Sequence, residues 1–172
     1  MATGVSTKLT GQIGEQLVSA VLGTKGFYAT PFSGNVPGFD LIATNAETLE
    51  SVPVQVKTSN SGTLAHSTIT KWVDIKISKK GVQTIGEPVE LAYPNVIWIM
   101  VHLKDQDIST ARFYIATALQ IQNVVIKHYR AMLAKHDGIR PRNPRTLHCA
   151  LFIKDLVEFE DNWSLFKTEE PM

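Results

Sequence analysis

The run Val96–Val101 restricts the possible folds most, because six consecutive apolar residues are typical of a strand buried on both faces. The spacing of apolar residues predicts one helix over 10–23 and a second over 118–135. Five more segments have strand character, namely 27–32, 39–44, 52–58, 72–77 and 113–116. This order predicts an α/β fold with a mixed central β-sheet flanked by helices, and no change in composition divides residues 1–172 into two domains. Residues 150–159 fit a strand and a helix equally well.

Composition excludes several classes of protein. Hydrophobic residues make up 44% of the chain, and 17 Lys and Arg against 16 Asp and Glu give a net charge of +1. This balance excludes wholesale disorder and the coating of nucleic acid by bulk charge. The single Cys149 excludes an internal disulfide and a Cys-based zinc finger, and fits a reducing, cytoplasmic environment. No apolar run approaches the roughly 20 residues that cross a bilayer, and the first 16 residues lack a signal-peptide pattern, so we expect no membrane partner.

Residues 52–59 carry the most informative pattern, because three valines alternate there with polar residues. Side chains alternate between the two faces of a strand, so the valines face one way and Gln55, Lys57 and Ser59 the other. The same segment therefore predicts a buried face and a face that carries an amide and an ammonium group side by side.

Two acidic residues are placed to join this polar face. Asp40 lies 15 residues before Gln55, after the turn signal Pro37-Gly38, and a hairpin between the two strands would bring it beside Gln55. Glu15 lies at the rim of the apolar face of the first helix, where its side chain can point inward over a sheet edge.

Together, Glu15, Gly38-Phe39-Asp40 and Gln55-Val56-Lys57 resemble the signature of the PD-(D/E)XK nuclease superfamily, within residues 11–59. The resemblance implies a restriction-endonuclease-like fold and a divalent-metal-dependent endonuclease that hydrolyses phosphodiester bonds of DNA. It also implies that Glu15, Asp40 and Gln55 surround Mg²⁺ or Mn²⁺, while Lys57 contacts the scissile phosphate or the attacking water. Because many members cut two strands with two sites, the resemblance admits a homodimer.

Two positions depart from that signature. Phe39 stands where the family name has proline, although this position varies in the superfamily. Gln55 replaces the usual Asp or Glu, as it does in some branches of the superfamily that include a group of homing endonucleases.

The chemistry of these residues agrees with the implied roles. Magnesium prefers oxygen ligands, and Asp40, the amide oxygen of Gln55 and the carbonyl of Val56 can supply them. Lys57 can stabilise negative charge that develops on a phosphate during hydrolysis. Because Gln55 is neutral, we expect weaker metal binding than at a site with three acids.

Other interpretations remain open at this stage. Lys57 could simply form a partly buried ion pair with Glu15 or Asp40, which predicts no metal dependence. A second alternative is a catalytically impaired nuclease-fold protein that serves as a DNA-binding or protein-interaction module. Gly11-x-x-Gly14 lacks the preceding strand and third glycine of a dinucleotide site, and the five histidines show no zinc-ligand spacing.

Charge is unevenly distributed along the chain. Residues 57–80 contain five lysines and one acid, residues 127–148 contain six basic residues and one acid, and residues 155–170 contain six acids and one lysine. The basic segments can grip phosphates, although lysines at 76, 79 and 80 could only keep an edge strand soluble. We expect the acidic segment to face solvent. The residues expected to contact DNA are Thr58, Ser59, Lys71, Arg140, Arg142 and Arg145.

Overall fold

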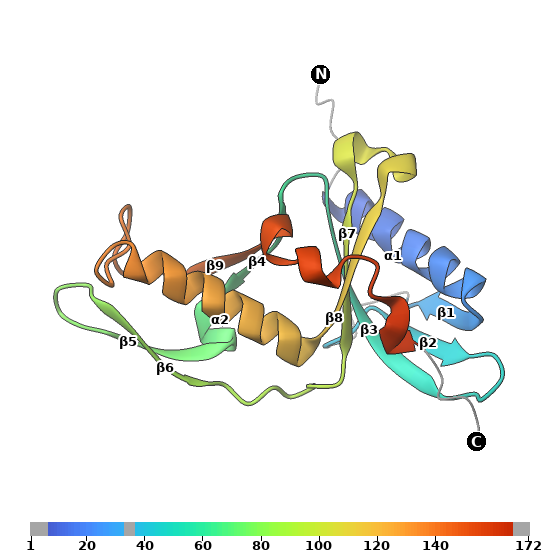
Figure 1. Cartoon of the computed structure of the whole chain (residues 1–172), viewed down its shortest axis with the longest axis horizontal. Helices are drawn as coiled ribbons and strands as arrows, with labels where there is room; N and C mark the ends of the chain where they lie inside the picture. Colours follow the sequence, from blue (N-terminus) through green and yellow to red (C-terminus); the bar gives the residue numbers. More distant parts are fainter. Residues whose placement is uncertain (1–6, 33–36, 167–172) are drawn as a thin grey trace.

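The computed structural model describes residues 7–32 and 37–166, which are built around a five-stranded sheet (Figure 1). In spatial order the strands are β1 (Phe27–Pro31), β2 (Leu41–Asn45), β3 (Ser51–Ser59), β7 (Ile97–His102) and β8 (Arg112–Thr117). β3 and β7 run parallel and the other neighbours antiparallel, so the sheet is mixed as predicted. β7 lies between two strands and buries four of its six residues, as its apolar sequence predicts.

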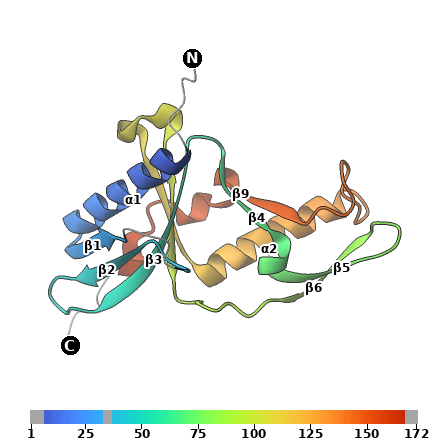
Figure 2. The ribbon, with the colours of Figure 1, turned by 180° about the vertical axis from the view of Figure 1, so that it is seen from behind.

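Helix α1 (Thr7–Thr24) covers one face of this sheet (Figure 2). Its buried residues Val18 and Leu22 pack against the valines of β3 and the isoleucines of β7. The side chains that form this layer include Val18, Leu22, Val54, Val56, Ile97 and Ile99. The alternation in β3 therefore works as predicted, with its even-numbered residues in the core beneath α1.

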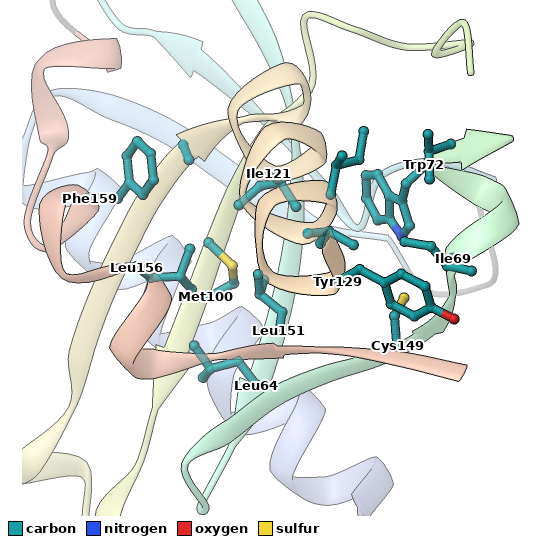
Figure 3. Close-up of a cluster of buried hydrophobic side chains, with 14 of the residues drawn as sticks. Leu64, Ile69, Trp72, Met100, Ile121, Tyr129, Cys149, Leu151, Leu156 and Phe159 are labelled. Atoms are coloured by element: carbon teal, nitrogen blue, oxygen red, sulfur yellow. The ribbon is translucent and has the colours of Figure 1, made fainter. Parts of the chain in front are cut away.

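The opposite face is covered by a second group of elements that projects to one side of the sheet, which we call the wing (Figures 1 and 2). The wing comprises β4 (Thr63–Thr68), β5 (Val73–Ile77), β6 (Gln83–Pro88), α2 (Ala118–Ala134) and β9 (His148–Phe152). β4 pairs with β9 and β5 pairs with β6, both antiparallel. Figure 3 shows the buried cluster that joins the wing to the sheet, with Met100 from β7, Ile121 from α2 and Leu151 from β9.

Buried amide side chains hold α2 to the two-stranded ribbon β5–β6. Gln122 of α2 donates to the carbonyl oxygens of Trp72 and Val89, each at 2.8 Å. Tyr129, two turns further along α2, donates to Gln83 Oε1 at 2.6 Å. Because buried polar groups cost free energy unless they are paired, these bonds fix the ribbon to the helix.

Three parts of the structure differ from the sequence-based predictions. β4 and β6 were not predicted, because both are short, largely polar strands without clear alternation. The undecided segment 150–159 forms the end of β9 followed by short 3₁₀ turns. Of the acidic segment, residues 167–170 lie outside the described residues; Glu158 and Asp161 are exposed as expected, whereas an oxygen of Asp155 is buried 2.7 Å from His128 Nδ1 and Glu160 pairs with Arg112. Within the described ranges, no helix is long and apolar enough to cross a membrane.

Candidate functional site

The candidate site lies next to the first residue of β2, where the pairing between β2 and β3 ends. Leu41 of β2 pairs with Val54 of β3 in the antiparallel register, so Asp40, one residue earlier, stands opposite Gln55. The Asp40 N–H donates to the carbonyl of Val54 at 2.8 Å. The hairpin predicted from the spacing of these residues is therefore present, and it brings Asp40 and Gln55 together.

The carboxylate of Asp40 occupies the position at which β2 stops pairing with β3. Its Oδ2 accepts a bond from the backbone N–H of Val56 at 2.7 Å, and it also accepts from the side-chain amide of Gln55. In a strand the N–H and C=O of one residue point to the same side. The Val56 carbonyl therefore points toward the side on which Asp40 lies.

Lys57 joins the same group from the polar face of β3. Its Nζ lies 3.7 Å from Asp40 Oδ2, with side-chain exposures of 41% for Lys57 and 26% for Asp40. Because both groups remain in contact with solvent, the pair adds about 0–1 kcal/mol to stability. The ammonium group is thus held beside the carboxylate and stays accessible to a ligand.

Glu15 reaches the site from α1, and a close helix–strand contact brings it there. A Cβ added at Gly14 would lie 1.7 Å from Thr58 Oγ1, so only glycine allows α1 to lie this near β3. Partial burial raises the pKa of Glu15, the negative charge of Asp40 raises it further, and Lys57 partly opposes both effects. Glu15 therefore shares one electrostatic environment with Asp40 and Lys57.

These residues provide a donor set that fits a hard divalent cation. Glu15 and Asp40 carry carboxylates, Gln55 carries an amide oxygen and Val56 a backbone carbonyl, and Mg²⁺ is commonly bound through one or two carboxylates with water and phosphate oxygens. In the structure the nitrogen Nε2 of Gln55, and not its oxygen, faces Asp40. No three His, Cys, Asp or Glu side chains gather in a metal-binding arrangement within residues 7–32 and 37–166. The two acids of this group are Glu15 and Asp40, and Gln55 is neutral.

The six residues expected to contact DNA do not lie together: two line the cavity beside Lys57, Thr58 has its hydroxyl buried against α1, and the three arginines lie in a separate loop. Ser59 and Lys71 line the same cavity as Lys57. The hydroxyl of Thr58 is buried at the contact with Gly14, so this geometry gives no support to a phosphate contact by Thr58.

The three arginines lie apart from Lys57, in the loop that follows α2 at the far end of the wing (Figure 1). Arg140 donates to the carbonyl of His148 at 2.5 Å, and Arg145 donates to that of Lys79 at 3.3 Å. Arg142 is exposed. The arginine loop and the turn between β5 and β6 therefore meet, which joins two basic segments that are separate in the sequence.

A cavity of about 780 Å³ lies between β3 and the wing. Its polar lining includes Gln55, Lys57, Ser59, Ser61, His66 and Lys71. Its apolar lining includes Leu64, Trp72, Leu91, Tyr93, Trp98 and Ile121. The cavity thus connects the polar face of β3 with aromatic side chains that come from elsewhere in the chain.

Sequence reasoning missed the roles of Gly14 and of the aromatic lining. A glycine inside a helix lowers helix stability by about 1 kcal/mol relative to alanine. A glycine at such a position therefore indicates that a neighbouring element packs too closely for a side chain. Trp72 and Trp98 lie on strand-like sequence patterns that favour the core; Trp72 is 8% exposed, yet both line the cavity. Trp98 pairs with Gln55 across β3 and β7, a contact that spans more than forty residues and leaves no local signal.

Comparison with solved structures finds a similar chain. It is a bacterial homing endonuclease, I-Ssp6803I, which superposes with a TM-score of 0.50 at 13% sequence identity over 94% of this chain and 93% of that one. The two chains share a fold. At this identity the likeness concerns architecture alone: a mixed five-stranded sheet flanked by helices, matching a nuclease-like fold. No protein-family model matches the chain, and no curated protein sequence matches it significantly.

Proposed function

We propose that this chain is a divalent-metal-dependent DNA endonuclease of the PD-(D/E)XK type in its Gln-x-Lys variant. The proposal rests mainly on one observation: the side chains of Asp40, Gln55 and Lys57 lie together, with Lys57 Nζ 3.7 Å from Asp40 Oδ2 and Gln55 bonded to the same carboxylate. An ion pair with a purely structural role would need only Lys57 and Asp40, and would not explain why Gln55 contacts the same carboxylate. The fold shared with a bacterial homing endonuclease supports the same activity.

In the proposed site, Asp40, Gln55, Val56 and Glu15 would hold Mg²⁺ or Mn²⁺ through oxygen atoms. When bound, the ion supplies charge stabilisation at the phosphate and a water of lowered pKa. Asp40 keeps its orientation through the Val56 N–H, so its carboxylate needs little reorganisation. Lys57 contacts a non-bridging phosphate oxygen and stabilises the charge that grows as water attacks phosphorus and the P–O bond breaks.

The substrate would approach through the polar rim of the cavity. Ser59 and Lys71 lie on this rim and can contact phosphates next to the scissile one. Arg140, Arg142 and Arg145 would contact phosphates further away, at the end of the wing. A cytoplasmic location and a homodimer stay predictions.

The direct test is cleavage of plasmid and branched DNA with Mg²⁺ or Mn²⁺ by the protein and its Lys57→Ala variant. Removing one preorganised charge donor lowers the rate by about 100- to 1,000-fold. Lys25→Ala is the matched control, because Lys25 lies after the end of α1 against the ring of Trp163. Cleavage by Lys57→Ala at the rate of the control would refute the assignment.

One observation favours a second candidate, a nuclease-fold protein that binds DNA or another protein without cutting. Asp40 Oδ2 already accepts bonds from Gln55 and Val56, and Gln55 contributes no charge to a metal site. Calorimetric titration with Mn²⁺ separates the candidates. Binding that Asp40→Ala abolishes and Gln55→Glu tightens supports the endonuclease, whereas absence of binding supports the second candidate.

A further inference from the structure

The cavity beside Lys57 combines two chemistries that a phosphodiester site alone does not need. Its rim carries hydroxyls and two ammonium groups, on Ser59, Ser61, Lys57 and Lys71. Its interior is aromatic and aliphatic. A volume of about 780 Å³ lies within the range of roughly 300–1,000 Å³ found for small-molecule sites, so the cavity can admit a group as large as a nucleotide.

Two tryptophans form the aromatic part, and they come from different layers of the molecule. Trp98 stands beside Gln55 in the register of β7 on β3, on the same sheet face as Lys57. Trp72 comes from the wing, and its ring centroid lies 5.7 Å from that of Trp98 at an interplanar angle of 62°. The cavity wall therefore begins directly next to the proposed catalytic residues.

Trp72 is held in place by hydrogen bonds to its backbone and by packing of its side chain. Its carbonyl accepts bonds from Gln122 Nε2 at 2.8 Å and from the N–H of Val89 at 3.1 Å. Its side chain lies against α2 in the buried cluster (Figure 3). The indole N–H is buried and has no hydrogen-bond partner among the described residues. This nitrogen is shielded from solvent, so Trp72 contributes to the cavity wall through its ring and not through this donor.

Tyr93 extends the aromatic lining toward the segment just before β2 that carries Asp40. Its ring packs against Gly38, where a Cβ would lie 2.8 Å from the ring and where φ is +94°. Tyr93 is 55% exposed, so much of the ring remains available for contact with a ligand. Gly38 thus connects the position of Tyr93 to that of Asp40, two residues later.

We propose that this cavity binds one unstacked base of a DNA substrate while Lys57 and Lys71 hold the adjoining phosphates. The inference rests on the proposed nuclease function, because it assumes a nucleic-acid substrate. A base offers a flat surface that can stack on the rings of Trp98 and Tyr93, which line the cavity. The cationic and hydroxyl-bearing rim is complementary to the phosphates on either side of that base.

Binding to three short duplexes tests this proposal, with EDTA present so that cleavage plays no part. One duplex is fully paired, the second carries one extrahelical thymidine, and the third carries an extrahelical abasic nucleotide at the same place. Unpairing a base costs free energy that an extrahelical base does not require. We expect the thymidine bulge to bind at least about tenfold more tightly than either of the others. Equal affinity for the thymidine and abasic bulges would overturn the proposal.

Variants then locate the base. Trp98→Ala should remove the preference for the thymidine bulge, Trp72→Phe should reduce it, and Trp163→Phe should leave it intact because Trp163 packs in the other core. Should Trp98→Ala not fold, cross-linking of the unmodified protein decides, with 5-iodouracil as the extrahelical base. Cross-links to Trp72, Trp98 or Tyr93 support the proposal, and cross-links only to residues outside the cavity overturn it.

These outcomes are distinguishable from failure of the endonuclease proposal. Metal-dependent cleavage without a base-dependent preference would leave the endonuclease standing and remove the base site. A base-dependent preference without cleavage in Mg²⁺ or Mn²⁺ would support the base site and count against the endonuclease.

Discussion

At the scale of single residues, the carboxylate of Asp40 has a structural contact as well as a proposed catalytic one. It accepts the N–H of Val56, a residue that is 5% exposed, at the point where the β2–β3 ladder ends. Gln55 and Lys57 approach the same oxygen atom. Substitutions at Asp40 should therefore change stability and activity by different routes, which allows the two roles to be separated.

We expect Asp40→Ala to lower the free energy of unfolding by about 1–3 kcal/mol, because it leaves the Val56 N–H without its acceptor. Asp40→Asn keeps an acceptor oxygen there and should be closer in stability to the unmodified protein. Urea unfolding of the three proteins measures the difference. Equal stability of Asp40→Ala and the unmodified protein would show that this hydrogen bond contributes nothing.

Glu15 should make stability depend on pH. Its pKa in the folded chain is raised above 4.5, so the folded state holds this proton more tightly than the unfolded state does. The free energy of unfolding therefore falls as pH rises from about 4.5 through the raised pKa. Without divalent ions, we expect Glu15→Gln to be more stable than the unmodified protein at neutral pH and to lose this advantage on acidification.

Thermal unfolding in EDTA between about pH 4 and pH 8 checks this expectation. A difference between the two proteins that stays constant across that range would contradict it. Because cations bind the ionised carboxylate, Mn²⁺ affinity of the unmodified protein should also weaken on acidification, beginning above the pH expected for an ordinary glutamate.

At the scale of elements, the contact of α1 with β3 sets the position of Glu15. Thr58 leaves no room for a side chain at Gly14, whereas a Cβ at Gly11 meets nothing within 4 Å. The two glycines lie in one helix and differ only in their surroundings. They form a matched pair for testing whether close packing of α1 builds the site.

We expect Gly14→Ala to destabilise the protein by about 1–3 kcal/mol through overpacking and to weaken Mn²⁺ binding by moving Glu15. Gly11→Ala should be neutral or stabilising by up to about 1 kcal/mol, because alanine favours a helix. Adding Thr58→Ala should restore part of the loss in Gly14→Ala. If both glycine variants unfold at the same denaturant concentration, the contact has no such role.

The elements that sequence could predict are those whose burial repeats at a regular interval. α1, β3, β7 and α2 each bury one face or both, so their apolar residues recur with the period of the element. β4 gains its position from long-range pairing with β9, which no local pattern reveals. β6 pairs with its neighbour β5, but its sequence does not alternate, and its Gln83 is held by Tyr129 of α2. The motif residues at 40, 55 and 57 were found because they lie on one hairpin, whereas the tryptophans of the cavity come from separate elements.

At the scale of the whole molecule, the net charge of +1 conceals how charge is distributed. Lys57 and Lys71 line the cavity, and three arginines follow α2, whose 17 residues span about 25 Å. Part of the acidic segment is neutralised by Arg112, which pairs with Glu160. Basic groups therefore lie both at the proposed catalytic site and at the far end of the wing.

Arg142, which is exposed in the wing loop, should contribute to DNA affinity without affecting the metal site. We expect Arg142→Ala to weaken DNA binding and to reduce the slope of log affinity against log salt concentration by about 0.9, the value for one phosphate contact. Titrations at several salt concentrations measure this slope, with Lys25→Ala as the control. An unchanged slope would place Arg142 outside the DNA contact.

The most direct test of the central claim is cleavage of supercoiled plasmid in Mg²⁺ and in EDTA by the unmodified protein and by Asp40→Asn. The account predicts nicking or linearisation by the unmodified protein only when Mg²⁺ is present. It also predicts a rate at least about 100-fold lower for Asp40→Asn, because several kcal/mol of charge stabilisation depend on the bound ion. Cleavage in EDTA, or equal rates for the two folded proteins in Mg²⁺, would contradict the claim that Asp40 builds a catalytic metal site.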